Sequence, residues 1–152
     1  MEACWMNPTQ VACSADDLRA EEILHERFEL ASSGVLLARV KTERGWGSHD
    51  DIRLAAEDPQ AEAKIARESD EHAHMEDEVR LVLDGHGVYD VRARDERWLR
   101  INVVPGDLLV IPAKRYHRFL LGPDAKVRYL QPFSERPGLI PLYRASDDET
   151  RC

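Results

Sequence analysis

The sequence predicts a mostly β domain, a small antiparallel sandwich or barrel with a few peripheral helices, mainly in the N-terminal part. Two observations lead to this fold class. From about residue 71, apolar and polar residues alternate with a period of two, as in strands that bury one face. In the same region turn-forming residues recur every eight to twelve residues or so, the spacing of short strands joined by hairpins.

The N-terminal third has a different pattern. Ser14 and the acidic residues after it are suited to cap a helix over 18–28, where apolar residues recur at helical spacing. The segment 34–40 is short, branched and apolar and follows a Ser-Ser-Gly turn signal, so we expect a strand there. A second helix is expected from Asp58 to Arg67, because Pro59 suits a first helical turn.

Six strands are expected in the period-two region. They cover residues 77–83, 87–92, 98–103, 108–111, 117–121 and 127–130. The segment 132–141 holds three prolines and a glycine, and we expect it to wrap the barrel without regular structure. We therefore expect one domain over residues 1–145, with its barrel core at about 70–131, and a flexible acidic tail over 146–152.

Composition narrows the classes of function. The chain has 152 residues, 43% hydrophobic and 33% charged, and a net charge of -8, which disfavours nucleic acid as a partner. It has no apolar run long enough to span a membrane and no secretion signal. Its three cysteines lack metal or disulfide spacing, which indicates a reducing compartment. We expect a cytoplasmic monomer or small homo-oligomer that acts on a small molecule.

One stretch, residues 71–80, carries the clearest chemical signal. Alternate residues of an extended strand share a face, so His72, His74 and Glu78 are expected to point the same way, together with Arg80. A later Pro-containing turn delivers His117 from a neighbouring strand. The sequence therefore predicts a metal site of three histidines and one carboxylate, with Arg80 as a cation facing the substrate.

The donor set restricts the chemistry of this site. Imidazole-rich sites with one hard oxygen suit Fe(II), Ni(II), Co(II), Mn(II) or Zn(II), and four protein donors leave two positions open on an octahedral ion. An enediolate or hydroxyketone that binds through two oxygens would be held there, electron-rich and able to react with O2. A tetrahedral zinc ion would be saturated by the same four side chains and inert.

Other candidate residues receive plainer interpretations. Phe119 lies two positions after His117 on the same predicted strand, so both side chains point to the same face. We expect Phe119 to line the pocket or the core. His86 lies on a hairpin tip between two glycines and is expected at the surface, and His25 and His49 have no partner pattern. The cysteines have no His-Asp constellation nearby, so no catalytic role is assigned to them.

These residues resemble a known family. The runs H-x-H-x3-E-x6-G from His72 and G-x5-P-x4-H from Gly106 resemble the two motifs of the cupin superfamily, whose fold is a double-stranded β-helix barrel. More narrowly, the segments EHAHMEDEVR, LDGHG, YDVR, WLRI and YHRF resemble the acireductone dioxygenase family over about residues 70–131. The resemblance implies a substrate site formed by Arg80, Phe119 and Arg128 around a metal held by His72, His74, Glu78 and His117.

The resemblance also implies a reaction of methionine salvage. With Fe(II), our first expectation, the acireductone 1,2-dihydroxy-3-keto-5-methylthiopentene is cleaved by O2 to a 2-keto acid and formate. With Ni(II) the family forms a shorter carboxylate, formate and carbon monoxide, and Co(II) or Mn(II) are further alternatives. Lys114 stands where cupins carry a glycine, with Arg115 beside it, which places two extra cations at the pocket rim or on the surface.

Two other functions stay open at this point. The same scaffold serves lyases or isomerases, and a divergent enzyme of this kind would act on a different enediol or hydroxyketone, with or without O2. A non-catalytic binding cupin is the third hypothesis, and it would be expected to lack one of the four ligands, all of which are present. Oxygen consumption separates the first two.

Overall fold

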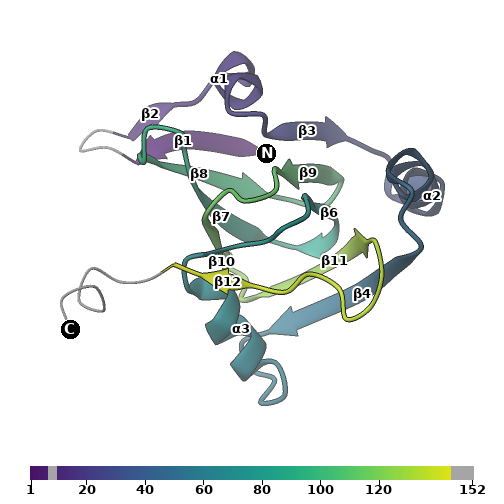
Figure 1. Ribbon diagram of the computed structural model, residues 1–152. Helices are drawn as coiled ribbons and strands as arrows, with labels where there is room; N and C mark the ends of the chain where they lie inside the picture. The colour runs from purple at the N-terminus through teal and green to yellow at the C-terminus, as the bar shows by residue number, and fades with distance from the viewer. Residues whose placement is uncertain (7–9, 145–152) are drawn as a thin grey trace.

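The computed structural model describes residues 1–6 and 10–144 and consists mainly of two antiparallel sheets (Figure 1). One sheet has the strand order β12-β5-β10-β7-β8-β1-β2. Its strands are β1 Glu2–Met6, β2 Gln10–Ala12, β5 His72–Ala73, β7 Gly87–Arg92, β8 Trp98–Val103, β10 His117–Leu121 and β12 Leu142–Tyr143. The second sheet has the order β3-β9-β6-β11-β4. Its strands are β3 Leu24–Arg27, β4 Ser48–Ala55, β6 Glu78–Gly85, β9 Asp107–Ile111 and β11 Lys126–Phe133.

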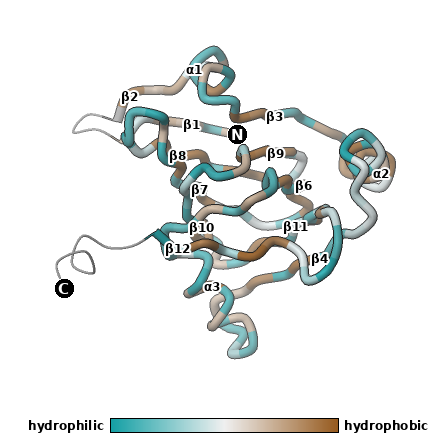
Figure 2. The backbone as a smooth tube through the Cα atoms, in the orientation of Figure 1, coloured by the Kyte–Doolittle hydropathy of each residue, from teal (hydrophilic) through white to brown (hydrophobic). Residues whose placement is uncertain are grey.

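The core lies between the two sheets because each strand turns its apolar residues inward. In β8, Leu99, Ile101 and Val103 are buried, whereas the residues between them are half-exposed. The inward residues of β7, β9, β10 and β11 complete this core. Figure 2 shows hydrophobic stretches in the strands of both sheets. Predominantly β structure in two antiparallel sheets, with few helices, confirms the predicted fold class.

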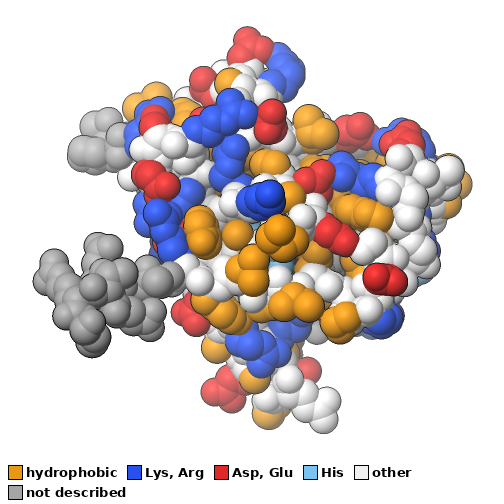
Figure 3. All heavy atoms as spheres, in the orientation of Figure 1, with side chains coloured by type: hydrophobic (Ala, Val, Ile, Leu, Met, Phe, Trp, Pro, Cys, Tyr) orange, Lys and Arg blue, Asp and Glu red, His pale blue; other side chains and the backbone are white. Residues whose placement is uncertain are grey.

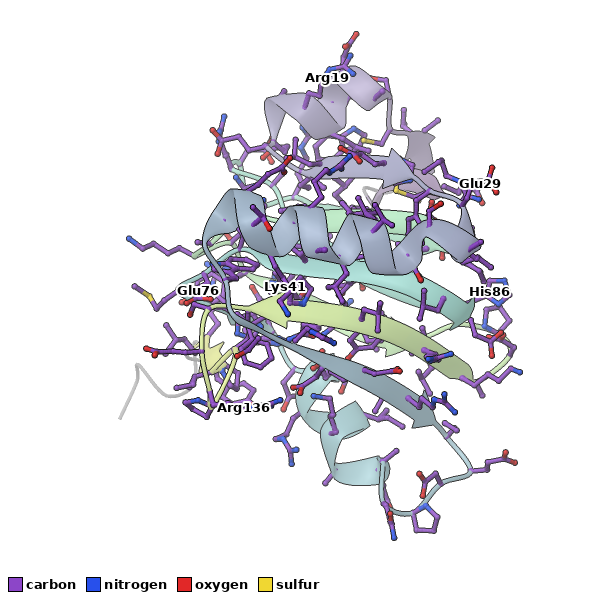
Figure 4. The ribbon with its side chains drawn as sticks, turned by 90° about the vertical axis from the view of Figure 1, so that its right-hand side faces the viewer. Arg19, Glu29, Lys41, Glu76, His86 and Arg136 are labelled. Carbon is purple, nitrogen blue, oxygen red and sulfur yellow. The ribbon has the colours of Figure 1, made fainter. Side chains whose placement is uncertain are left out.

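Three α-helices lie around the barrel. They are α1 Ala15–Ala20, α2 Ser33–Arg44 and α3 Glu62–Ser69, and a 3-10 turn, Leu30–Ser32, precedes α2. α2 lies across the outer face of the five-stranded sheet, where Leu36, Leu37 and Val40 pack on strand residues of β6, β9 and β11 (Figure 4). Within the described ranges, no helix is both long and apolar enough to cross a membrane.

The N-terminal predictions needed correction. The helix predicted over 18–28 ends at Ala20, because Glu22 adopts a left-handed backbone with φ 61° and the chain continues as strand β3. The strand predicted over 34–40 is wrong, since this segment forms most of α2. The helix predicted over 58–67 is present as α3, shifted toward the C-terminus.

The six strands predicted in the barrel region are confirmed as β6 to β11, with β11 extended to Phe133. The strands β1 to β5 and β12 were not predicted. After Phe133 the segment up to residue 141 has no helix or strand, as expected. The predicted tail, 146–152, lies outside the described residues.

Lys114 occupies the turn before β10 with φ 66°, the left-handed conformation that favours glycine. Its backbone N–H donates to the carbonyl of His74 at 2.7 Å, a bond that a glycine would keep. We expect Lys114→Gly to raise the free energy of unfolding by about 0.5–1 kcal/mol, because the side chain is exposed and the backbone strain is removed. Urea denaturation tests this, and a lowered unfolding free energy would contradict it.

Candidate metal centre

Three histidines converge between the strands of the seven-stranded sheet. His72 begins β5, His74 follows that strand, and His117 begins β10 directly opposite His72 in the antiparallel register. All three side chains are buried. One potential ligand atom from each lies within 4.8 Å of the others, close enough for a single ion to contact all three.

Backbone carbonyls fix the orientation of each imidazole. The Nδ1 atoms of His72, His74 and His117 lie 2.6, 3.0 and 2.9 Å from the carbonyl oxygens of Asp70, Ile140 and Arg115. A carbonyl only accepts, so each Nδ1 carries the proton and donates it. The Nε2 lone pairs are therefore left free, as in metal-binding histidines whose other nitrogen is held by a hydrogen bond.

Glu78 brings a carboxylate to the same point. Its Oε2 lies 3.1 Å from Nε2 of His117, and its Oε1 lies 3.7 Å from Nε2 of His74. Glu78 Oε2 and His117 Nε2 are both buried without a hydrogen-bond partner among the described residues. Two buried lone-pair atoms that face each other are costly unless a cation lies between them. The residues therefore fit a divalent metal ion.

The charge states at this point suit metal binding. Burial raises the pKa of Glu78, but the nearby Arg80 and His117 outweigh it and hold this pKa well below the usual range, so the carboxylate is ionised. Burial and the neighbouring His117 lower the pKa of His72, which favours the neutral ligand form. Burial also acts to lower the pKa of His74, yet the carboxylate of Glu78 raises it overall. A bound cation would take over this stabilising role from the proton.

Arg80 lies behind Glu78, on the same strand and only 1% exposed. Its Nη2 donates to Glu78 Oε1 at 2.9 Å and to Glu68 Oε2 at 2.8 Å. Burial acts to lower the pKa of Arg80, but the two carboxylates raise it well above its usual range. The guanidinium is thus a permanent cation that holds a candidate ligand in place.

Aromatic rings surround the rest of this guanidinium. Its Cζ lies 4.1 Å from the ring centroid of Tyr129, 4.6 Å from that of Phe119 and 5.2 Å from that of Tyr89. Its Nε and Nη1 atoms have no hydrogen-bond partner among the described residues. Ring faces stabilise such a cation by cation–π attraction, which accounts for a charge buried without further acceptors.

Glu68 is a residue that the sequence interpretation missed. It lies on α3, and burial alone would raise its pKa, but Arg80 outweighs this and lowers it. The chain of contacts Glu68–Arg80–Glu78 therefore connects α3 to the metal centre. In the sequence, Lys64 and Glu68 form an ordinary i,i+4 pair of a solvated helix, so no pattern pointed to this role.

A pocket of about 210 Å³ opens beside the histidines. One wall is charged and comes from α3, and the opposite wall is apolar and comes from the segment after β11. The lining residues are Lys64, Arg67, Glu68, His72, His74, Leu139, Pro141 and Tyr143. Figure 3 shows apolar side chains beside Lys and Arg side chains on the face where β12 and α3 lie.

None of the three predicted substrate residues, Arg80, Phe119 and Arg128, lines this pocket. Phe119 is buried in the core beneath the Arg80 guanidinium. Inward-facing Tyr129 follows Arg128, and Arg128 turns outward to pair with Asp51 at 2.7 Å on the outer face of the five-stranded sheet. Its contact with the substrate stays a prediction.

Lys114 and Arg115 were expected at the pocket rim or on the surface, and neither lines the pocket. Arg115 pairs with Glu21 at 2.8 Å, and the exposed Lys114 side chain is not among the pocket residues. The cations that do line the pocket, Lys64 and Arg67, come from α3 instead.

Comparison with known proteins agrees with this geometry. The sequence matches the model of the ARD/ARD' family over residues 11–141. The chain belongs to the ARD/ARD' family. Among curated relatives, acireductone dioxygenase 1 of Coprinopsis cinerea is 39% identical over 139 residues, 90% of this chain and 78% of its own length. Acireductone dioxygenase of Heterostelium pallidum is 34% identical over 131 residues, 86% of this chain and 90% of its own length.

A solved structure shows the same fold for this ARD/ARD' family member. Acireductone dioxygenase from Bacillus anthracis, with a cadmium ion in its active center, superposes with a TM-score of 0.84 at 23% identity, covering 93% of this chain and 97% of that one. The predicted cupin barrel is confirmed. Family membership and the three-histidine cluster identify the chain as a metal-dependent dioxygenase, as the sequence predicts.

Proposed function

We propose that this protein cleaves the acireductone 1,2-dihydroxy-3-keto-5-methylthiopentene with O2 to a 2-keto acid and formate, a reaction of methionine salvage. The observation that supports this best is the donor set, in which three buried imidazoles and the unpartnered Oε2 of Glu78 converge on one point beside a small pocket. The many relatives named acireductone dioxygenase support the substrate.

His72, His74, His117 and Glu78 are the proposed ligands, and Fe(II) is the proposed metal, with Ni(II), Co(II) or Mn(II) as alternatives. A metal ion held by these residues would supply Lewis acidity toward the enediolate oxygens and the redox chemistry that O2 requires. In the overall reaction the bond between the two enediol carbons breaks, and each product receives one oxygen atom from O2.

The chain's own residues supply orientation and charge balance. Carbonyls of Asp70, Ile140 and Arg115 hold the three imidazoles with Nε2 turned inward. Arg80 is a positioning residue in this proposal, because it reaches the site through Glu78 and does not line the pocket. Leu139, Pro141 and Tyr143 offer an apolar wall against which a methylthio tail would lie.

Oxygen uptake tests the reaction type. Fe(II)-loaded protein given the enediol in air should consume one O2 per enediol and release one formate, and metal-stripped protein should do neither. If the loaded protein consumes the enediol without O2 uptake, the proposed reaction is wrong and the lyase or isomerase hypothesis replaces it. We also propose that the protein is cytoplasmic and that it is a monomer or a small homo-oligomer.

A further inference from the structure

We propose that Lys64 and Arg67 form a cationic wall that recruits the enediolate anion to the metal centre. This inference rests on the proposed function, since it concerns the same pocket. Both residues lie on α3 and line the pocket together with His72 and His74. They are three positions apart, so their side chains share one face of the helix.

The substrate's chemistry calls for such a wall. An enediol conjugated with a ketone is a vinylogous carboxylic acid and is anionic at neutral pH. The protein carries a formal net charge of -8, so its average field opposes this ligand. Because distant charges are screened beyond about 8 Å at physiological salt, cations at the pocket itself decide the local field.

The pairing of these two cations leaves positive charge available. Lys64 Nζ is 3.6 Å from Glu68 Oε1, but the same carboxylate also pairs with Arg80 at 2.8 Å. Arg67 makes no ion pair or side-chain hydrogen bond within the part of the chain that the structure describes. Glu68 and Glu78 together balance Lys64 and Arg80, so Arg67 is the cation left without a carboxylate partner among the described residues.

Nearby arginines outside the pocket are neutralised. Arg92 pairs with Glu71, Arg144 pairs with Glu71 and Glu96, and Arg115 pairs with Glu21. The wall opposite α3 is formed by the apolar and aromatic residues Leu139, Pro141 and Tyr143. Unbalanced positive charge is thus concentrated on the α3 side of the pocket, where an anion would meet it on the way to the histidines.

The double variant Lys64→Met/Arg67→Met tests the wall, since methionine keeps the aliphatic stem and removes the charge. In Fe(II)-loaded protein at about 20 mM ionic strength we expect kcat/KM to fall about tenfold, with kcat within twofold of wild type. The anaerobic dissociation constant of the enediolate should rise by a similar factor. At about 0.5 M salt the difference should shrink below about twofold, because screening then also weakens the wild-type wall.

The matched control is Arg53→Met/Lys126→Met, which removes two cations from the outer face of the five-stranded sheet. It changes the net charge equally and should leave kcat/KM and the dissociation constant within about twofold of wild type. The proposal is overturned if Lys64→Met/Arg67→Met binds the enediolate as tightly as wild type at low salt. It is also overturned if the control loses as much, or if the loss does not depend on salt.

The same measurements distinguish failure of the proposed reaction from failure of the cationic wall. Wild-type protein that binds the enediolate without consuming O2 refutes the proposed reaction, while the dissociation constants of the variants still decide the role of the wall. Wild-type turnover combined with unchanged affinity in the double variant refutes the wall alone. A wild-type protein that does not bind the enediolate refutes both.

Discussion

Replacing His117 with alanine is expected to remove the bound metal and abolish O2 uptake. The substitution deletes one of four converging donors and leaves Glu78 Oε2 facing an empty space in a buried site. We expect metal affinity to fall about a hundredfold or more, since even residues that only orient a ligand typically cost 10–100-fold. Elemental analysis of the purified variant and O2 uptake with the enediol measure both effects.

His86→Ala is the matched control for this substitution. His86 is an exposed histidine at the turn between β6 and β7, paired with Asp124 at 2.8 Å, and it is not one of the converging donors. It should keep one metal ion per chain and wild-type O2 uptake. Near-normal metal content in His117→Ala would contradict this prediction, because it would show that other residues hold the ion.

Replacing Arg80 with methionine is expected to lower the free energy of unfolding of the metal-free protein by about 3–5 kcal/mol, because breaking a buried ion pair leaves an uncompensated charge. Here two carboxylates, Glu78 and Glu68, would lose their shared partner. Saturating metal should recover part of the loss, because the ion compensates Glu78. Urea denaturation with and without metal measures both quantities.

Arg128→Met provides the comparison, because Arg128 also pairs with a carboxylate but does so at the surface, with Asp51. Exposed ion pairs contribute little, so its unfolding curve should stay close to wild type. If Arg80→Met is as stable as Arg128→Met, the buried contacts of Arg80 with Glu68 and Glu78 are not what holds this part of the barrel together.

The barrel strands were predictable because their signal is local. The alternation of Leu99, Ile101 and Val103 with polar residues specifies a strand with one buried face, and the turns at Gly85 and Gly106 have positive φ, which glycine adopts without strain. Short apolar segments without alternation are ambiguous. Residues 34–40 were predicted as a strand, but Leu36, Leu37 and Val40 equally fit one helix face, and packing on the outer sheet selects the helix.

In the metal centre, too, the residues with a local sequence signal were predictable and the others were not. The spacing of His72, His74 and Glu78 predicted that these side chains meet, and the structure brings them together with His117. They do not share one strand face as expected, because His72 lies on β5 of the seven-stranded sheet and Glu78 on β6 of the five-stranded sheet. The contact of Glu68 with Arg80 depends on how α3 packs against the barrel, which no local pattern encodes. The expectation for Arg128 came from the resemblance alone, and in this fold its neighbour Tyr129 occupies the inward position.

The most direct test of the metal centre is anomalous diffraction from crystals of the Fe(II)- or Co(II)-loaded protein. We predict a single strong peak at about 2.0–2.2 Å from Nε2 of His72, His74 and His117 and from a carboxylate oxygen of Glu78. The Nδ1 atoms should keep their hydrogen bonds to the backbone carbonyls. A peak bound by other residues, or the absence of one at these four side chains in loaded protein, would contradict the account.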